Sequence, residues 1–399
     1  MPKFLCSSSA LLRQLKQVAH VVRRNPVVPV LANVLLAATG NELRIIGSDL
    51  ETTVAVSLPI EGGNGETWGI CPPLKPLLDV LGNLPDQPIT VELGPKENQL
   101  TVRAVAYASD EEQGGATGGA SYTFGCELYG DYPKTPTVRD EVQLVIPGHL
   151  LRTAIGYASD LTATDQFRPA MMCVHVIADA RGVQFQATDG HRAVQFDVQA
   201  AKEPGYSFTG AQAKKLLLPK QSIATLKALV KSEDVVTVTA QAGWGHARIQ
   251  IGAWGPEVTV RLVDERFPDL AAVIPTEFPG GILTLSRPSA QAMLRRLKPF
   301  VSFLTPKVHL CFSGTGGQAK AFDEGEDIEA REPLPGTFAA GDLKEIAFNI
   351  NLMSQVLSLL PGPRLRMHFT GENKAAVLTS DGYEGLRYLL MPVTIRQYA

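Results

Sequence analysis

The stretch from Val183 to Phe196 concentrates side chains that could do chemistry around a single glycine. A hydroxyl, a carboxylate, an imidazole and a guanidinium lie within five residues, contributed by Thr188, Asp189, His191 and Arg192. Apolar residues alternate with polar ones on both sides of Asp189-Gly190, a pattern typical of a β-hairpin whose turn uses glycine for a positive φ. The sequence therefore predicts a compact turn over residues 188–192 that is either a catalytic site or a docking site.

Catalysis at this turn would use Thr188 as the nucleophile and His191 as its base. An imidazole oriented by a carboxylate, here Asp189, is a common catalytic arrangement. Residues two apart across a glycine turn are usually held by turn hydrogen bonds, however, and no Ser or Cys nucleophile elbow accompanies them. A hydrolase using Asp189 and His191 is therefore the less favoured hypothesis.

Other cofactor and metal chemistry has little support in the sequence. Gly314-x-Gly316-Gly317 is not clearly followed by a helix, and there is no G-x-x-x-x-G-K-[ST] motif, so we expect no ATP hydrolysis. The seven histidines show no i, i+4 pair, and the five cysteines form no C-x-x-C pair. We expect no cofactor and no metal.

Composition predicts a soluble globular chain. With 399 residues, 45% apolar and 19% charged, it can bury a large core divided among two to four domains. An odd number of widely spaced cysteines favours a reducing cytosol over a disulfide framework. The first residues lack the apolar run of a signal peptide, and no apolar run is long enough to cross a bilayer. We expect a cytoplasmic protein with no membrane partner.

The chain repeats itself at a spacing of roughly 140 residues. A short strand followed by an amphipathic helix occurs at Lys3–Arg24, at Glu141–Ser159 and at Gly281–Ser302. Ser7-Ser8-Ser9 should cap the first helix, Pro147 should lead the second, and the third should run from Ser289 to Lys298. A spacing this long indicates three copies of one domain rather than a solenoid, and we assign them to residues 1–140, 141–277 and 278–399.

Each copy contains a second, related half. Strand, helix and strand follow one another again in the ranges Glu66–Leu93, Lys215–Thr239 and Glu345–Phe369. Short alternating runs between these units, such as Leu43–Ile46 and Val258–Leu262, read as antiparallel strands. The predicted fold is α+β, with two β-α-β-β-β halves per domain, sheets on one side and two helices on the other.

Positive charge gathers on four of the expected helices. The windows 10–25, 148–159, 214–232 and 287–299 hold fourteen Lys and Arg residues and no Asp or Glu, so the rest of the chain carries −17 to give the net −3. Such segregation favours attraction of phosphates at these helices over an ordinary solvated surface. The sequence therefore indicates a nucleic-acid partner despite an acidic total.

Over nearly its full length the chain resembles the β subunit of bacterial DNA polymerase III, the DNA sliding clamp family. The resemblance rests on the words Pro29-Val-Leu-Ala-Asn-Val-Leu-Leu36, Ser48-Asp-Leu-Glu51, Ala187-Thr-Asp-Gly-His-Arg192, Leu218-Pro-Lys220, Phe267-Pro-Asp269, Val273-Ile-Pro275, Phe348-Asn349 and Met391-Pro-Val393. Each word is weak alone, but their order and spacing together are specific to the family.

The resemblance implies a ring of two chains, head to tail, whose helices surround duplex DNA without reading its sequence. Phosphate contacts by Lys and Arg carry no sequence information, so such a ring can slide. The implied DNA-binding residues are Arg24, Arg168, Lys214, Lys215, Arg295 and Arg296. The implied homodimer interface joins Tyr122 and Phe124 to Phe300 and Val301.

The resemblance also makes the turn at residues 188–192 part of a pocket that binds short peptide motifs. The implied pocket residues are Met171, Thr188, Gly190, His191, Arg192, Ala193, Pro268, Val273, Asn349, Leu352, Leu389, Met391, Pro392 and Val393. The implied partners are the replicative DNA polymerase catalytic subunit, an ATP-driven clamp loader, and other polymerases, ligase and mismatch-repair proteins that carry clamp-binding motifs. The chain itself would be a non-catalytic processivity factor, with polymerase and 3'-5' exonuclease activities in partner subunits.

Several positions depart from the family pattern and change what the pocket should prefer. Ala193, Ala272, Leu352 and Thr394 stand where the family often has leucine, arginine, an aromatic residue and arginine, and residues 396–399 extend the usual end. We expect the insert at 108–121 and the acidic run Asp323–Glu332 to face outward. A non-replicative scaffold that shares the clamp domain remains the alternative.

Overall fold

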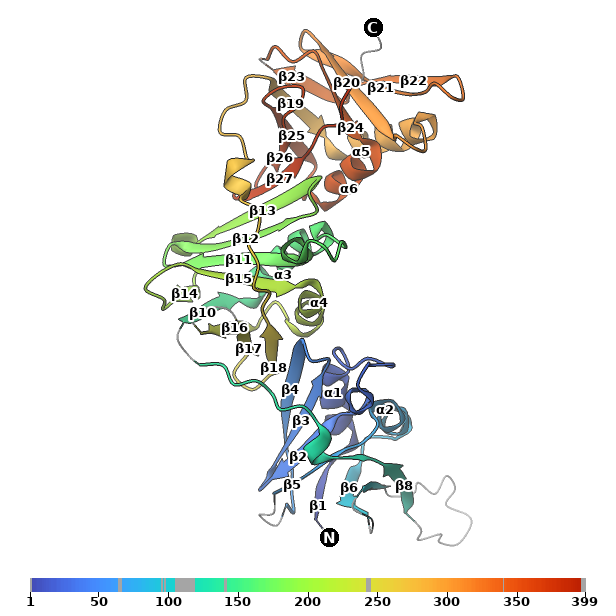
Figure 1. Cartoon of the computed structure of the whole chain (residues 1–399), viewed down its shortest axis with the longest axis vertical. Coiled ribbons are helices and arrows are strands. Elements are labelled where there is room, and N and C mark those ends of the chain that lie inside the picture. The colour runs from blue at the N-terminus through green and yellow to red at the C-terminus, as the bar shows by residue number, and fades with distance from the viewer. Residues whose placement is uncertain are drawn as a thin grey trace. The chain divides into compact units, whose positions relative to one another are not determined.

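The computed structural model describes residues 2–63, 67–94, 96, 98–104, 119–139, 142–241, 245–339 and 341–395. Most of the 108–121 insert and the extension at 396–399 therefore lie outside the described residues. The chain forms two compact units (Figure 1). Unit 1 comprises Met1–Arg152, Gly205–Gly210 and Gln221–Leu262, and unit 2 comprises Thr153–Pro204, Ala211–Lys220 and Val263–Ala399.

Unit 1 contains one large and one small antiparallel sheet. The large sheet has the order β14 (Ser207–Phe208), β10 (Val142–Pro147), β16 (Val235–Ala240), β17 (His246–Ile251), β18 (Glu257–Arg261), β4 (Thr52–Pro59), β3 (Glu42–Ser48), β2 (Leu35–Thr39), β5 (Thr67–Cys71) and β9 (Glu127–Leu128). The small sheet has the order β1 (Lys3–Ser7), β6 (Pro88–Leu93), β7 (Gln99–Ala104) and β8 (Ala120–Gly125). The pair β18–β4 joins strands from distant parts of the chain.

Unit 2 repeats this plan. Its large sheet has the order β15 (Lys214–Pro219), β11 (Cys173–Asp179), β12 (Gly182–Thr188), β13 (Arg192–Gln199), β27 (Leu386–Leu390), β26 (Ala376–Ser380), β25 (Arg364–Phe369), β19 (Gly281–Ser286) and β23 (Gly336–Ala339). Its small sheet has the order β22 (Ile328–Pro333), β21 (Gly316–Asp323), β20 (Lys307–Ser313) and β24 (Glu345–Asn349). Here β13–β27 is the long-range pair.

The helices are short and amphipathic. They are α1 (Ser8–Val18), α2 (Leu74–Asn83), α3 (Gly148–Ala158), α4 (Lys220–Leu229), α5 (Arg287–Leu297) and α6 (Ile350–Leu359). Helix α1 packs on α2 and on β4, and α5 packs on α6 (Figure 1). Leu11, Leu15 and Val18 are buried at helical spacing, so the apolar stripe of α1 faces the core. No helix in the described part of the chain is both long and apolar enough to span a membrane.

The predicted α+β fold and all six strand-helix-strand units are confirmed. Ser7 caps α1 as expected, because its hydroxyl accepts the Ala10 amide at 3.2 Å. Two helix starts differ from the prediction. Pro147 is the last residue of β10, where it pairs with Val235, and α3 begins at Gly148. Helix α5 begins at Arg287 rather than Ser289, with a proline in its first turn.

Three turns of similar sequence connect strands in the large sheets. Ser48-Asp49-Leu50, Thr188-Asp189-Gly190 and Ser380-Asp381-Gly382 each place their third residue at positive φ, at 75°, 88° and 81°. The first follows β3, the second β12 and the third β26. The same turn conformation therefore recurs in both units.

Candidate functional site

The turn at residues 188–192 joins β12 to β13 in register Thr188↔Ala193, which confirms the predicted hairpin. The Thr188 hydroxyl donates to the Arg192 carbonyl oxygen at 2.8 Å and accepts the Gly190 amide at 3.1 Å. Gly190 has a φ of 88°, and a Cβ there would lie 3.3 Å from the Met171 methyl. Glycine is thus favoured by the backbone conformation and also lets Met171 lie close.

Asp189 holds the turn together and is fully engaged in doing so. Its Oδ1 accepts the amides of His191 and Arg192 at 2.9 and 2.8 Å. Its Oδ2 accepts the Arg192 guanidinium through Nε at 3.0 Å and Nη2 at 2.6 Å. Both oxygens are therefore bound to the turn itself and do not orient the His191 ring, which removes the geometric basis for the hydrolase hypothesis.

The C-terminal tail lies against this turn. Arg192 and Ala193 pair with Leu390 and Leu389 of β27, and the Met391 amide then donates to the His191 carbonyl oxygen at 2.9 Å. Two residues later, the Val393 amide donates to the Ala347 carbonyl oxygen of β24 at 2.8 Å. The structure thus brings the Met391-Pro392-Val393 word beside the Thr188–Arg192 turn, although they are about 200 residues apart.

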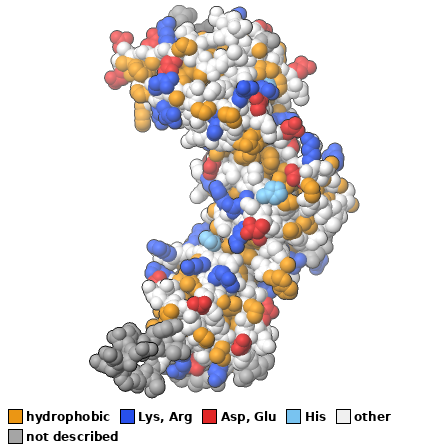
Figure 2. Space-filling view, turned by 180° about the vertical axis from the view of Figure 1, so that it is seen from behind, with side chains coloured by type: hydrophobic (Ala, Val, Ile, Leu, Met, Phe, Trp, Pro, Cys, Tyr) orange, Lys and Arg blue, Asp and Glu red, His pale blue; other side chains and the backbone are white. Residues whose placement is uncertain are grey.

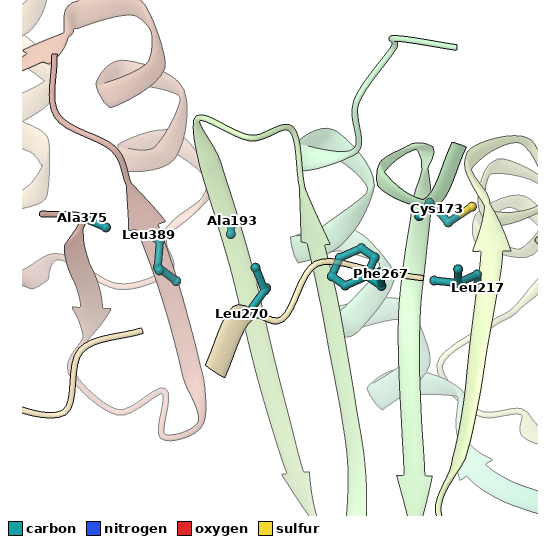
Figure 3. Packing of buried hydrophobic residues seen from close by; sticks show 8 residues of the cluster. Cys173, Ala193, Leu217, Phe267, Leu270, Ala375 and Leu389 are labelled. Carbon is teal, nitrogen blue, oxygen red and sulfur yellow. The ribbon is translucent and has the colours of Figure 1, made fainter. Parts of the chain in front are cut away.

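A buried apolar cluster underlies the turn and the tail. Its members come from η4 (Pro169–Met172), β11, β13, β15, β27, the residue before β26, and the segment that leads into η6 (Leu270–Ala272). Figure 3 shows this last segment crossing the strands. The cluster comprises Ala170, Cys173, Ala193, Leu217, Phe267, Leu270, Ala375 and Leu389, with Val263 and Ile274 packed against it. Burial raises the pKa of the Cys173 thiol to about 12, so this thiol stays protonated and serves as a small apolar filler.

His175 borders this cluster on β11. Its ring stacks on Phe267 at a centroid distance of 4.6 Å, and its Nδ1 lies 3.0 Å from the Gln186 side-chain oxygen. Burial lowers the pKa of His175, and this outweighs the opposing effect of the Gln186 hydrogen bond. The ring therefore packs beneath Phe267 in its neutral form.

Exposed apolar residues form the rim above the cluster. Val273 is 46% exposed and Met391 is 38% exposed. Leu389, on β27, is only 2% exposed. Pro268, also exposed, follows Phe267 directly. Figure 2 shows hydrophobic side chains gathered on one face at the level of β13 and β27, with a histidine beside them. An exposed apolar rim over a buried apolar floor can accept leucine and aromatic side chains.

Helix α6 supplies the remaining wall. Arg192 Nη1 donates to the Gln355 side-chain oxygen at 2.6 Å, which ties the turn to this helix. Asn349 is the N-cap of α6, and its Oδ1 accepts the amides of Asn351 at 2.9 Å and Leu352 at 3.3 Å. Only the Asn349 Nδ2 is left for a peptide, so this side chain can donate to a peptide carbonyl but has little capacity to accept a peptide amide.

The residues predicted for the pocket thus come from five separate segments of the chain, and the turn, the tail and α6 among them are linked by hydrogen bonds. Sequence reasoning missed its buried members, especially Phe267, Leu270, Leu217 and Cys173, and the Gln355 contact. Two signals were available: Phe267 opens the word Phe267-Pro-Asp269, and Leu217 precedes Leu218-Pro-Lys220 on an apolar strand. Neither signal says which face of its strand or segment is buried.

The charged helices carry a second set of candidate residues. Within the described residues, nine of the fourteen counted cations are exposed and form no ion pair: Arg13, Lys16, Arg24, Lys215, Lys220, Lys227, Lys231, Arg295 and Lys298. Arg24, Lys215 and Arg295 of the predicted DNA-binding set are among them. Arg168 is also exposed but lies 3.6 Å from Asp165, and Lys214 is half-buried at the start of β15. The excess of unpaired cations on these elements remains large.

Two of the counted arginines are structural instead. Arg152 Nη1 donates to the carbonyl oxygens of Lys227 and Val230 at the end of α4. Arg287 Nη1 donates to the Leu360 carbonyl oxygen, just after α6, at 3.0 Å. A guanidinium at a helix C-terminus satisfies carbonyls that have no partner within the helix. These charges belong to helix ends and cannot be assigned to DNA.

Arg296 and Arg23 are partly neutralised. Arg296 makes a two-pronged ion pair with Glu332, at 2.9 Å from Nε and 2.5 Å from Nη2. Arg23 donates to Asp49 at 3.0 Å and to the Gln221 side-chain oxygen at 2.5 Å. A phosphate would have to compete with Glu332 for Arg296, so the two adjacent arginines of α5 are not equivalent.

The four predicted interface residues lie at edges of the two units. Tyr122 and Phe124 are on β8, an outer strand of the small sheet of unit 1. Tyr122 is half-buried and Phe124 is 8% exposed. Phe300 ends η7 (Lys298–Phe300) and is half-buried, as is Val301. The following residues Phe303 and Leu304 are far more exposed, at 95% and 87%, and the sequence did not single them out.

Among the described residues, no three of the His, Cys, Asp and Glu side chains are positioned to hold one metal ion. Gly314 to Gly317 connect β20 to β21 in a hairpin, so no helix follows this glycine run. The acidic run Asp323–Glu332 is exposed along the edge strand β22 and its turn, as expected.

Comparisons with known proteins point to one family. Residues 2–114 match the family model described as DNA polymerase III beta subunit, N-terminal domain. The beta sliding clamp of Synechocystis is 25% identical, with 98% of this chain and 99% of the relative aligned. The beta sliding clamp of Vibrio cholerae is 26% identical, with 98% and 100% aligned. These matches confirm the resemblance to the family over the whole chain.

Solved structures confirm the fold. A DNA polymerase sliding clamp from Pseudomonas aeruginosa superposes with a TM-score of 0.85 at 24% identity, covering 99% of this chain and 100% of the other. One from Bacillus subtilis gives a TM-score of 0.84 at 17% identity, with the same coverage. The arrangement of strands and helices is thus retained where four in five residues differ.

Proposed function

We propose that this chain is a non-catalytic member of the bacterial DNA polymerase III beta subunit family, a sliding clamp that keeps a DNA polymerase on its template. The observation that carries the proposal is the clamp fold over the full chain combined with an apolar surface at the Thr188–Arg192 turn. The acid-free windows on four helices supply the attraction for phosphates.

The proposed assembly is a homodimeric ring of two chains arranged head to tail. Each chain would contribute three domains, residues 1–140, 141–277 and 278–399, so that twelve helices line the hole. Tyr122 and Phe124 of one chain would meet Phe300 and Val301 of the other. Support for this interface comes from the half-buried aromatic side chains and from β8 being an outer strand with unpaired backbone groups.

DNA would be held by topology rather than by tight contacts. Arg24, Arg168, Lys214, Lys215, Arg295 and Arg296 are the proposed phosphate ligands. Contacts to phosphate position a protein but carry no sequence information, so the ring can slide. Working on DNA during replication, the clamp would act in the cytoplasm of a bacterial cell.

Peptide tails of partners would bind at the apolar surface. The proposed partners are the polymerase catalytic subunit, the ATP-driven clamp loader, and other polymerases, ligase and mismatch-repair proteins with clamp-binding motifs. Leucine and phenylalanine side chains would enter over Leu389 and Ala193, while Met391 adapts to different motifs. Ala193 leaves more room there than a leucine would, so we expect a bulkier apolar residue to be preferred at this position.

The decisive experiment is retention on circular DNA. The chain should load onto a nicked circle when a clamp loader and ATP are present, and should be lost after the circle is cut. Equal retention on circular and linear DNA would contradict a ring and favour a non-replicative scaffold. Replacing Met391 and Pro392 together should abolish binding of a Gln-Leu-x-Leu-Phe peptide and leave the dimer intact; loss of the dimer would show that the pocket is misplaced.

A further inference from the structure

A cavity in unit 1 is not explained by the proposed function. It has a volume of about 680 Å³ and lies where α1 ends and α2 begins. Its walls come from the segment that follows α1, from the end of η1 (Pro29–Ala32) and from the first turns of α2. This volume is within the range of about 300–1,000 Å³ that is typical of small-molecule sites.

Much of the wall of this cavity is apolar. Helix α1 packs on α2, and each helix buries an apolar stripe, comprising Leu11, Leu15 and Val18 on α1 and Leu74, Leu77 and Leu81 on α2. At the cavity, Val22 and Leu78 are only half-buried. The two helices therefore leave apolar side chains uncovered at this end, and an apolar group that enters the cavity would be removed from water there.

The polar part of the lining carries more cations than carboxylates. Arg24, which also belongs to the predicted DNA-binding set, is exposed and forms no ion pair with a described residue. Lys75 pairs with Asp79 at 2.6 Å, but the two side chains are 68% and 61% exposed, and such an exposed pair contributes little. Asp79 is the one acidic residue among the described residues of the lining. The cavity therefore favours a ligand that has an anionic group beside an apolar body.

Two amide side chains also line the cavity. Neither Asn25 nor Asn33 forms a side-chain hydrogen bond with a described residue, although Asn33 is half-buried. The backbone amide of Asn33 donates to the Val30 carbonyl oxygen at 3.0 Å, so its backbone is fixed while its side chain is left for a ligand. A side-chain amide offers an acceptor and two donors in one plane, and asparagine uses them to pair with the edge of an adenine base.

We propose that this cavity binds a single nucleotide, preferably one with an adenine base. The flat base would lie against Val22 and Leu78 with its edge at Asn33, and the phosphate would lie at Arg24 and Lys75. A nucleotide joins a planar body with apolar faces to an anionic group, which matches the wall and the charge of the cavity. The ligand is either a free nucleotide or the end of a single DNA strand, and only the second source rests on the proposed clamp function.

The test uses dAMP as the probe and the full chain. Methyl NMR spectra should show saturable shifts of the Val22 and Leu78 signals. Lys75→Glu should weaken dAMP binding about tenfold, because a charge-assisted hydrogen bond to the phosphate is lost. Lys134→Glu is the matched control, since Lys134 is exposed in the same unit, forms no ion pair with a described residue and does not line the cavity. This variant should bind dAMP as the unaltered chain does.

A second variant tests the contact with the base. Asn33→Leu keeps a side chain of similar size but removes the amide. It should weaken dAMP binding and leave the binding of deoxyribose 5-phosphate unchanged, because only the base loses a hydrogen-bond partner.

Three results would overturn the proposal. The first is no shift of the Val22 and Leu78 signals at millimolar dAMP, and the second is equal weakening by Lys75→Glu and Lys134→Glu. The third is deoxyribose 5-phosphate that binds the unaltered chain as tightly as dAMP does, since the cavity would then hold an anion without a base.

A 5'-phosphorylated strand of five deoxyadenosines distinguishes the two sources of the nucleotide. Displacement of dAMP by this strand assigns the cavity to a DNA end, whereas a strand that does not displace bound dAMP assigns it to a free nucleotide. These measurements use neither a clamp loader nor circular DNA. Failure of the nucleotide site is therefore observed separately from failure of the ring.

Discussion

Replacing Arg192 with glutamine should loosen the turn that carries the peptide surface. The Arg192 side chain is 10% exposed and donates to Asp189 through two nitrogens and to Gln355 through a third. Arg192→Gln keeps the backbone and a polar side chain, but it removes the positive charge and the pair of guanidinium nitrogens that donate to Asp189. The link between the turn and α6 is thereby lost.

The expected cost is about 2 kcal/mol, within the range for a hydrogen bond to a charged group. It should stay below the roughly 3–5 kcal/mol of a broken buried ion pair. The reason is that Asp189 keeps the amides of His191 and Arg192 as partners, so its charge is not stranded. About 2 kcal/mol corresponds to roughly a thirtyfold increase in local opening.

Native-state hydrogen exchange measures this opening at single amides. The His191 amide donates within the turn and the Met391 amide donates to the His191 carbonyl oxygen, so both should exchange about thirtyfold faster in Arg192→Gln. Affinity for a Gln-Leu-x-Leu-Phe peptide should fall in parallel, because an ordered turn is needed to hold it.

The chain provides a matched control in the neighbouring hairpin. Asp179 accepts the amides of Arg181 and Gly182 and the Arg181 guanidinium with nearly the same geometry, but the Arg181 side chain is 91% exposed. Arg181→Gln should leave exchange and peptide affinity unchanged, since exposed ion pairs contribute little. Equal effects of the two substitutions on exchange and peptide affinity would show that burial does not strengthen the ion pair of Arg192 with Asp189.

Three further predictions follow from the same contacts. Arg295→Gln should reduce the slope of log affinity for DNA against log salt concentration by about 0.9 per lost phosphate contact. Arg296→Gln should reduce this slope by less, because Glu332 already holds Arg296. Equal slopes for the two variants in anisotropy titrations would contradict this. Asn349→Ala should cost about 1 kcal/mol through loss of the α6 cap, seen as faster exchange of the Asn351 amide. Burial lowers the pKa of His175 below 6.5 in the folded chain, so the unfolded chain binds this proton more readily. The free energy of unfolding should therefore fall as the pH drops below 6.5. In urea unfolding, His175→Gln should show a smaller difference in this free energy between pH 7.5 and pH 5.5 than the unaltered chain does.

Local structure was predictable because it is encoded in short segments. Period and cap residues located the helices to within a few residues, and alternation located several of the strands. Pro147 was assigned to a helix because proline is favoured in the first turn of a helix. Proline is also tolerated as the last residue of a strand, which is where Pro147 lies. The next residue, Gly148, donates its amide to the Asp234 carbonyl oxygen at 2.7 Å. The local signal for these two outcomes is the same.

The fate of individual cations was not predictable, because it depends on partners far along the chain. Arg152 donates to a carbonyl oxygen near the end of α4, 75 residues later in the chain. Arg296 forms its ion pair with Glu332, 36 residues later. Counting charges along the helices overstated the number of cations that are free of partners within the chain. The buried floor of the peptide surface was missed for a similar reason: β13 pairs with β27 only after the chain has passed through most of unit 2.

Two of the repeated turns are held by the same hydrogen bonds, from backbone amides to an aspartate side chain. After Ser48, the Asp49 Oδ1 accepts the amides of Glu51 and Thr52, much as Asp189 does for the two residues that follow Gly190. Leu50 occupies the glycine position there and is 51% exposed at a positive φ, a conformation that costs a branched side chain roughly 1–3 kcal/mol. At the second turn glycine removes that cost, and the freed space is bordered by Met171 and by the tail that binds the His191 carbonyl. The first two turns thus share this frame. Glycine at the third position and a tail arriving from the far end of the chain distinguish the second turn from the first, and we propose that these two features allow it to bind a peptide.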